Sequence, residues 1–316
     1  REVDEICKYF LGIDPAEDLI PVRPAQHYSM GGIRTDYRGE SIGLKGLFAA
    51  GEAACWDMHG FNRLGGNSVA ETVVAGMLVG EFIADFLDQN ASESHAPAAL
   101  AREFLDREAG ELKALGESVN GNNPFQLLRE MQYIMTERVG IFRDGERLQR
   151  AVAKLKDLLV RSRRLELRSQ ARGPNPELVA AYRLPKMLKL ALCVSEGALA
   201  RTESRGAHYR EDFPRRDDAN WLSRTLAYWP DANADAPELS YQALDVMSME
   251  LPPGWRGYGP KDHIDHPDTA RREAEIEQLQ AEHADRFALQ RALLPFDGQL
   301  PLRFRGRNER QGVGCD

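Results

Sequence analysis

The sequence predicts an α+β fold: an α/β part comes first, then a helical bundle, then a mixed C-terminal region. Residues 20–50 alternate in polarity and are rich in turn residues, which is typical of strands and hairpins. Long segments between residues 100 and 203 carry apolar side chains at helical spacing with charged outer faces. From about residue 212 the chain turns irregular and rich in tryptophan, tyrosine and proline.

The first elements follow from local patterns. Residues 2–10 predict a short amphipathic helix, and Pro15 marks the turn after it. The apolar run 47–50, which ends at Gly51-Glu52, predicts a buried strand. A strand is therefore expected just before the first glycine-rich loop.

That loop, residues 59–68, is expected to feed a helix from Ser68 to Leu87. Ser68 is a natural N-cap. Apolar side chains recur along the helix at helical spacing, namely Val69, Val73, Met77, Phe82 and Phe86. A strand, a glycine-rich loop and a helix in this order form the most chemically loaded part of the sequence.

The bundle is expected to contain helices over residues 100–115, 125–138, 145–165 and 176–203. Pro185 is expected to kink or interrupt the last of them. A further polar helix is predicted over residues 268–293, followed by a charged tail.

Composition excludes several classes of protein. The 316 residues are 42% hydrophobic and 28% charged, and no window approaches ~18 uninterrupted apolar residues. No segment is therefore expected to span a bilayer, and any membrane association requires a partner. The net charge of −8 argues against a nucleic-acid partner.

Two groups of residues indicate more than the overall composition does. One is an arginine cluster, expected to form a solvated or ion-paired face: Arg161, Arg163, Arg164, Arg168 and Arg172. The other is the set of cysteines, which show no C-x-x-C spacing: Cys7, Cys55, Cys193 and Cys315. They predict neither a disulfide framework nor a cysteine metal site, and they favour a reducing compartment.

Three motifs carry the chemistry: residues 27–33 (HYSMGGI), 51–55 (GEAAC) and 59–68 (HGFNRLGGNS). Their order and spacing resemble those of the flavoprotein subunits of fumarate reductase and succinate dehydrogenase. The resemblance continues through 201–208 (RTESRGAH) and its acidic neighbours, so it covers essentially the whole chain. Residues 56–58 (WDM) are most similar to the fumarate reductases that use menaquinol.

The resemblance implies a set of site residues. His27 and Arg63 correspond to the residues that bind the substrate. Those that bind FAD correspond to Tyr28, Glu52, Asn67, Ser68 and Val69. The chemistry is consistent, because fumarate and succinate are dianions and an arginine offers a two-pronged fork to a carboxylate. A histidine donates a hydrogen bond in either protonation state.

Each motif alone has a plainer interpretation. His27 could be a turn histidine, Arg63 a surface ion pair, and the start of the following helix a simple cap; the co-occurrence of the motifs favours the site. His59 is expected to position the loop. His263 and His266 have H-x-x-H spacing but no helical context and no third ligand, so no metal site is expected.

The resemblance also implies a domain organisation. Residues 1–20 correspond to a remnant of a cap domain and 21–90 to the closing part of the FAD-binding α/β domain. Residues 91–215 correspond to the helical bundle and 216–316 to the C-terminal domain. The segment 201–208 is expected to serve packing or an interface rather than catalysis.

Part of the family's machinery has no counterpart in this sequence. The G-x-G-x-x-G turn is absent. The proton-donor arginine, and the histidine that carries the covalent flavin in membrane-bound members, are expected upstream. Because the chain opens at Arg1 inside a helical pattern, we expect it to be a piece of a longer protein and to be inactive alone.

The implied function is the interconversion of fumarate and succinate by an FAD-dependent oxidoreductase. Electrons would pass through an iron–sulfur subunit to quinone at a membrane anchor, with the chain peripheral on the cytoplasmic face of the inner membrane. One alternative is L-aspartate oxidase, against which the long region after residue 205, including 256–259 (RGYG), argues. Another is a non-catalytic scaffold that docks an iron–sulfur subunit, which a buried His27 or Arg63 would favour. The net direction and the covalent flavin link stay open.

Overall fold

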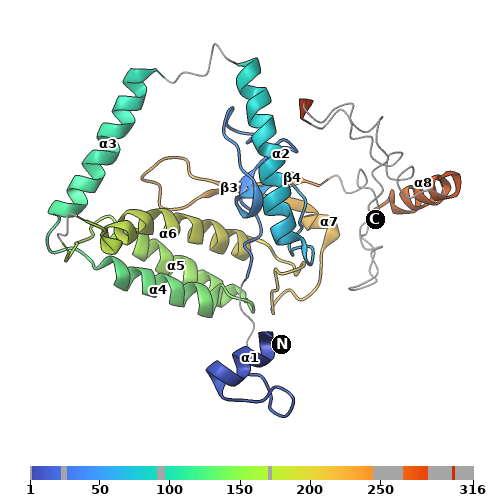
Figure 1. Ribbon diagram of the computed structural model, residues 1–316, viewed down its shortest axis with the longest axis horizontal. Coiled ribbons are helices and arrows are strands. Elements are labelled where there is room, and N and C mark those ends of the chain that lie inside the picture. The colour runs from blue at the N-terminus through green and yellow to red at the C-terminus, as the bar shows by residue number, and fades with distance from the viewer. Residues whose placement is uncertain are drawn as a thin grey trace.

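The computed structural model describes residues 2–22, 27–90, 97–169, 173–244, 266–283 and 301–302. Over these residues the predicted α+β fold is confirmed, with long helices and only short strands. Figure 1 shows α4, α5 and α6 stacked as a bundle, with α2 and the C-terminal hairpin beside it.

The N-terminal segment is helical, as predicted. Helix α1 (Glu2–Ile6) continues into the π-helical turn η1 (Cys7–Leu11). Gly12 ends it in the left-handed conformation, with its amide bonded to the carbonyl of Cys7. Cys7, Cys55 and Cys193 are free thiols, and Cys315 lies outside the described residues.

The region that precedes α2 is a small parallel pair with a hairpin between its strands. Strand β1 (Ile33–Arg34) pairs with β2 (Ala54–Cys55), which directly follows the 3-10 turn η2 (Gly51–Ala53). The predicted buried strand over 47–50 is wrong, because only Phe48 forms a bridge there and Leu47 is 38% exposed. A fully buried strand needs bonded neighbours on both sides. Residues 39–41 bond to this segment on one side, where the amide of Ser41 donates to the carbonyl of Leu47 at 2.7 Å and the amide of Ala49 to that of Gly39 at 2.8 Å, and no described strand pairs with it on the other.

Helix α2 (Asn67–Gln89) confirms the predicted helix but presents a different face to the protein. Its buried residues are Ser68, Glu71, Ala75, Val79 and Phe82. Of the residues that recur at helical spacing, Val69, Val73 and Met77 are 73%, 65% and 55% exposed, whereas Phe82 is buried. Apolar residues occur on two sides of this helix, so periodicity alone could not select the packed side.

The bundle contains α3 (Ala98–Glu117), α4 (Pro124–Arg138), α5 (Gly145–Arg161) and α6 (Pro176–Ala200). Asn123, Asp144 and Asn175 cap α4, α5 and α6 with side-chain oxygens. The core lies between these three helices, and its fully buried members include Leu148, Leu155, Leu184, Leu188 and Leu192.

Helix α6 runs without a break through Pro185 to Ala200, so of the two predicted effects of this proline, a kink or an interruption, the interruption does not occur. Leu184 and Leu188 on either side are fully buried, and their packing offsets the hydrogen bond that proline removes. Two arginines of the predicted cluster are ion-paired as expected: Arg161 with Glu130 at 2.8 Å and Arg163 with Asp235 at 2.7 Å.

The C-terminal region is more regular than predicted. After α7 (Asp218–Trp221), β3 (Ser223–Tyr228) pairs antiparallel with β4 (Glu238–Ala243) from Ser223↔Ala243 to Tyr228↔Glu238. The irregular structure expected here is therefore wrong over these residues. The loop between the strands contains prolines and asparagine, which masked the strand pattern on either side.

Helix α8 (Thr269–Glu282) confirms the first part of the predicted polar helix. The rest of that helix lies outside the described residues, as do Arg172, Trp255, residues 256–259 and His263. In the described part of the chain, no helix has the length and apolarity to cross a bilayer, and no cluster of side chains suits a metal ion.

Candidate functional site

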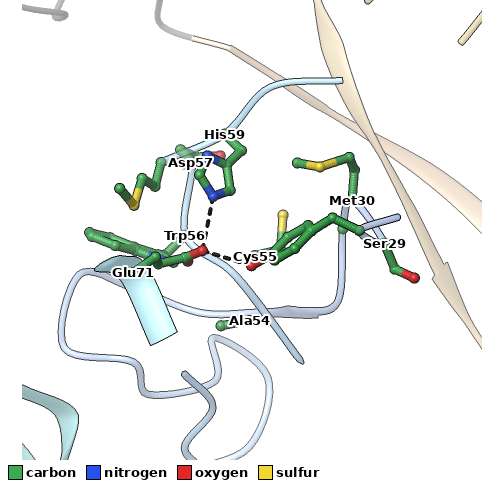
Figure 2. Close-up of a pocket in the computed structure, with 11 residues that line it drawn as sticks. Ser29, Met30, Ala54, Cys55, Trp56, Asp57, His59 and Glu71 are labelled. Atoms are coloured by element: carbon green, nitrogen blue, oxygen red, sulfur yellow. Dashed lines mark hydrogen bonds and ion pairs between the residues drawn. The ribbon is translucent and has the colours of Figure 1, made fainter. Parts of the chain in front are cut away.

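A buried carboxylate on α2 joins two of the motifs. The Oε2 atom of Glu71 accepts hydrogen bonds from the Tyr28 hydroxyl at 2.8 Å and from His59 Nε2 at 2.9 Å. Its Oε1 atom accepts one from Trp56 Nε1 at 2.8 Å. Glu71 is only 3% exposed, and Figure 2 shows these side chains converging on it.

The charge state of this cluster follows from its donors. Burial opposes ionisation of Glu71, but the hydrogen bonds from Trp56, Tyr28 and His59 outweigh it and lower its pKa below the usual value. Burial, and then the bond to Glu71, raise the pKa of Tyr28 to about 12. Glu71 is therefore an anion and Tyr28 a neutral donor at neutral pH.

The cavity beside the cluster is small. It has a volume of about 20 Å³ and is lined by residues of the segments 28–31 and 54–59 and by Glu71. That is room for a water molecule and not for a four-carbon dicarboxylate. The cluster is therefore the support behind a site rather than the substrate cavity itself.

The glycine-rich loop leads from this cluster to Arg63. His59 Nδ1 accepts from the amide of Leu64 at 3.4 Å, so His59 positions the loop, as the sequence predicted. Arg63 is half-buried, and its Nη1 donates to the hydroxyl of Ser68. Neither Arg63 nor the exposed His27 is turned into the core. A buried position of either residue would have favoured the scaffold interpretation.

The start of α2 differs from the expected cap. The N-cap is Gly66, and no side chain caps the helix. The predicted cap, Ser68, lies inside the first turn, where its hydroxyl accepts from Arg63 instead. The prediction of Ser68 as the cap is therefore wrong, because the N-cap lies two residues earlier, at Gly66.

An uncapped helix start of this kind fits an anionic ligand edge. The first turn consists of Asn67, Ser68 and Val69, the last of which is exposed to solvent. A Cβ at Gly65 or Gly66 would meet open space. The amide of Asn67 donates to the carbonyl of Leu64 at 3.1 Å, so the helix-start argument applies to the amides of Ser68 and Val69. Orphan amides at a helix N-terminus bind negative charge, which suits the cofactor role expected of this turn.

The other two predicted cofactor residues are tied to the same region. Glu52 accepts from the amide of Ser29 at 2.6 Å, which links η2 to the segment that carries His27. The Tyr28 hydroxyl points to Glu71, so only the backbone of this residue is left to line a ligand. The charges of Glu52 and Arg63 both act on the pKa of Tyr28, in opposite directions, so all three residues lie within electrostatic range.

Gly32 explains the paired glycines of the first motif. Its φ is +120°, and a Cβ there would lie 2.4 Å from the carbonyl oxygen of Ala53. Only glycine permits this close approach of the segment after His27 to the turn that carries Glu52.

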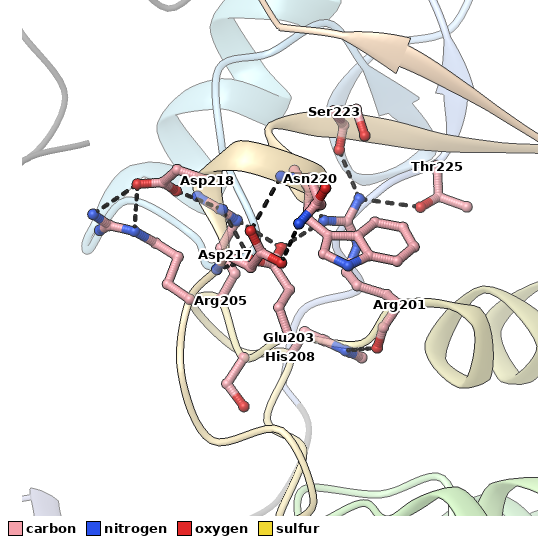
Figure 3. Close-up of polar contacts among 12 residues, drawn as sticks. Arg201, Glu203, Arg205, His208, Asp217, Asp218, Asn220, Ser223 and Thr225 are labelled. Atoms are coloured by element: carbon pink, nitrogen blue, oxygen red, sulfur yellow. Dashed lines mark hydrogen bonds and ion pairs between the residues drawn. The ribbon is translucent and has the colours of Figure 1, made fainter. Parts of the chain in front are cut away.

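A second anchor holds the loop from the bundle side. The guanidinium carbon of Arg201 lies 4.7 Å from the ring centre of Phe61, and the amide of Ala207 donates to the carbonyl of Phe61 at 3.0 Å. Arg201 is buried and pairs with the fully buried Glu203 at 2.6 Å. Figure 3 shows how this segment gathers its polar partners around Glu203. These contacts are those of a packing network, as expected for residues 201–208.

A third anchor comes from the C-terminal hairpin. Asp57 has a φ of 74° and accepts from Arg224 Nε at 2.6 Å and Nη2 at 2.5 Å. Arg34 of β1 pairs with the same carboxylate at 3.1 Å. The loop is thus fixed to α2, to the segment after α6 and to β3.

Sequence reasoning missed the residues that build these anchors: Arg34, Trp56, Asp57, Glu71 and Arg224. Glu71 carries only a weak signal, as an acidic residue three positions after Ser68 in a largely apolar helix. Its burial, which makes partners necessary, is known only from the structure. Asp57 and Arg224 are 167 residues apart and carry no local signal.

Comparison with known proteins defines the class of the chain. Residues 1–69 match the family model described as FAD binding domain. Residues 128–258 match the model described as fumarate reductase flavoprotein C-term. These matches define the class as a flavoprotein family of FAD-dependent oxidoreductases.

Within that class, the chain belongs to the fumarate reductase and succinate dehydrogenase flavoprotein subunit family. It is 44% identical to the fumarate reductase flavoprotein subunit of Helicobacter pylori, over 98% of this chain and 47% of that protein. It is 40% identical to the Escherichia coli subunit, over 81% of this chain and 41% of that protein. The chain thus spans about half the length of the curated relatives it matches.

Solved structures agree with this assignment. The chain superposes on an E. coli quinol fumarate reductase with a TM-score of 0.74 at 35% identity, covering 84% of this chain and 44% of that one. It also superposes on a quinol–fumarate reductase with menaquinol molecules, with a TM-score of 0.71 at 37% identity. This second superposition covers 78% of this chain and 42% of the other.

Proposed function

We propose that the protein to which this chain belongs interconverts fumarate and succinate, and that His27 and Arg63 bind the substrate carboxylates. The observation that carries this proposal is the bond from Arg63 to Ser68 in the uncapped first turn of α2. It puts a cation for a carboxylate directly beside backbone donors for a flavin.

The chain's own residues bind and orient. Arg63 carries five N–H donors, so the bond to Ser68 leaves a fork for one carboxylate. His27, which is exposed, donates to the other. The first-turn residues Asn67, Ser68 and Val69 hold the anionic edge of the cofactor. FAD, when bound, supplies the hydride chemistry. No proton donor is assigned within this chain.

Partners and location follow from the same family. We propose that electrons are exchanged with an iron–sulfur subunit and, through a membrane anchor, with quinone. The flavoprotein would lie peripherally on the cytoplasmic face of the inner membrane. Two of the similar solved structures are quinol–fumarate reductases, which supports a quinone at the far end of the electron path.

The test uses the full-length protein loaded with FAD and measures fumarate-dependent oxidation of a reduced dye. Arg63→Ala is expected to lower kcat/KM, with a loss of transition-state stabilisation of about 3 kcal/mol or more, on the scale of a lost charge-assisted contact. Arg147→Ala, which removes a half-exposed arginine from α5, serves as the matched control and should stay near wild type. Near-wild-type activity of Arg63→Ala would sink the assignment, and oxidation of L-aspartate instead of succinate would favour the alternative enzyme.

The 316-residue chain alone is expected to be inactive in this assay. It spans about half of its relatives and has no G-x-G-x-x-G turn. Turnover of fumarate by the purified chain would contradict this expectation.

A further inference from the structure

Glu71 is linked to the chain neighbours of both proposed substrate-binding residues, directly to Tyr28 and through His59 to Leu64. Through Oε2 it holds the side chain of Tyr28, which follows His27. The same oxygen holds His59, whose other ring nitrogen accepts from the amide of Leu64, which follows Arg63. One carboxylate therefore connects the backbone at His27 to the backbone at Arg63.

The contacts of Glu71 require a carboxylate. Tyr28, Trp56 and His59 all donate to it, so the side chain at this position must offer acceptors only. A glutamine of the same shape would present its amide N–H groups to at least one of these donors. Because Glu71 is 3% exposed, water could not repair the mismatch.

We propose that Glu71 is a positioning residue that sets the separation of His27 and Arg63, so that both reach the two carboxylates of one substrate. This inference rests on the function proposed above and adds to it the group that fixes the spacing. Glu71 touches no substrate atom in this arrangement; it acts through Tyr28 on one side and through His59 on the other.

The rival is a purely structural role, in which loss of Glu71 lowers stability and leaves the site geometry intact. Glu177 provides a matched control, because it is a buried carboxylate that accepts from the amides of Arg168 and Ser169, both at 2.8 Å. Its partners belong to the bundle and not to the loop. Glu177→Gln should therefore lower stability without changing dicarboxylate binding.

The experiment uses the full-length protein with its FAD, in the oxidised state, and titrates succinate by calorimetry in the absence of turnover. Thermal unfolding of each variant is measured in parallel. Glu71→Gln is expected to weaken succinate binding and to raise the KM for fumarate by about tenfold or more, since a shift of about 1 Å in a binding group can cost about 100-fold. Glu71→Asp, which keeps the charge, should recover part of the loss.

The two arms can be separated with Tyr28→Phe and His59→Phe. Each should weaken succinate binding, and Tyr28→Phe combined with Glu71→Gln should cost less than the sum of the two single changes. These single-arm variants also carry the test if Glu71→Gln does not fold.

Two outcomes overturn the proposal. One is wild-type succinate affinity in Glu71→Gln together with a stability loss like that of Glu177→Gln. The other is unchanged affinity in both single-arm variants. Failure of the proposed function would look different, because succinate would then not bind the wild-type protein or would bind Arg63→Ala equally well.

Discussion

In the network behind the loop, a half-buried arginine shares a hydrogen bond with a buried histidine. Arg143 Nη1 lies 2.8 Å from His208 Nδ1, and since arginine only donates, His208 must accept. His208 Nε2 then donates to the carbonyl of Arg201 at 3.4 Å. Burial first, and then the charge of Arg143, lower the pKa of His208 to about 4. The hydrogen bond to the carbonyl of Arg201 opposes this shift, and the charges of Arg201 and Arg210 add to it.

This histidine should make stability depend on pH. Its pKa is lower in the folded state than the ordinary 6.5, so the unfolded state binds more protons between about pH 6.5 and 4. The stabilisation is present above pH 6.5 and is lost as the pH falls to 4, a loss on the order of 3 kcal/mol. Urea unfolding of the full-length protein at several pH values measures it.

The control for this prediction is His208→Asn, which removes the titrating group. The difference in unfolding free energy between wild type and variant should shrink as the pH falls from 6.5 to 4. Parallel pH profiles for the two proteins would contradict the assignment of His208 as a neutral acceptor.

At the element scale, the loop between β2 and α2 takes its shape from distant partners. Glu71 holds Trp56 and His59, Arg224 holds Asp57, and the segment after α6 holds Phe61. The loop has glycines and no regular structure of its own. Its conformation is therefore a property of three elements that pack around it.

Gly206 offers a direct test of this docking. Its φ is +57°, and a Cβ there would lie 2.8 Å from Cβ of Phe61. Gly206→Ala is expected to destabilise the full-length protein by about 1–3 kcal/mol, through backbone strain and a clash with the loop. Chemical unfolding measures the change.

Gly173→Ala is the matched control, because a Cβ at Gly173 would meet nothing within 4 Å. It should leave stability within about 0.5 kcal/mol of wild type. Equal effects of the two substitutions would show that the loop does not dock against Gly206.

Local patterns predicted the helices well and their packing poorly. The predicted spans of α2 and α4 agree with the structure to within two residues, because amphipathic spacing is a local signal. Helix α5 begins at Gly145 as predicted but ends at Arg161, before the predicted residue 165. The buried side of α2 and the β3–β4 register depend on what the rest of the chain presents to them. Ser68 also shows that local patterns do not determine contacts. It is a residue type that often caps helices, but here its hydroxyl accepts a hydrogen bond from Arg63.

At the scale of the whole molecule, burial is concentrated in α4, α5 and α6. Their leucines form one continuous core, whereas α3 has no buried residue and is held to α6 by contacts such as the bond from Tyr182 to Glu108 at 2.6 Å. Opening of α3 should therefore cost far less free energy than opening of α5.

Hydrogen exchange of the full-length protein tests this difference. Amides of α5 and of the middle of α6 are expected to exchange slowest, and those of α3 to exchange orders of magnitude faster. Equal protection of α3 and α5 would mean that α3 is covered by contacts outside the described residues.

Part of the candidate site could be predicted from local sequence, and part of it depends on long-range contacts. The motifs around His27, Glu52 and Arg63 could be recognised from sequence because their residues lie close together in the chain. Glu71 and its partners could not be linked in advance, since the Tyr28–Glu71 bond spans 43 residues. What the sequence lacked was the distance between segments, which only the fold supplies.

The shared acceptor on α2 has an evolutionary consequence. Because three donors depend on one carboxylate, a substitution at Glu71 leaves Tyr28, Trp56 and His59 without their acceptor all at once. No single compensating change restores all three, so these four positions should vary together across lineages or not at all. A single substitution at any one of them would give a protein that is less fit than both the starting sequence and the sequence in which all four have changed.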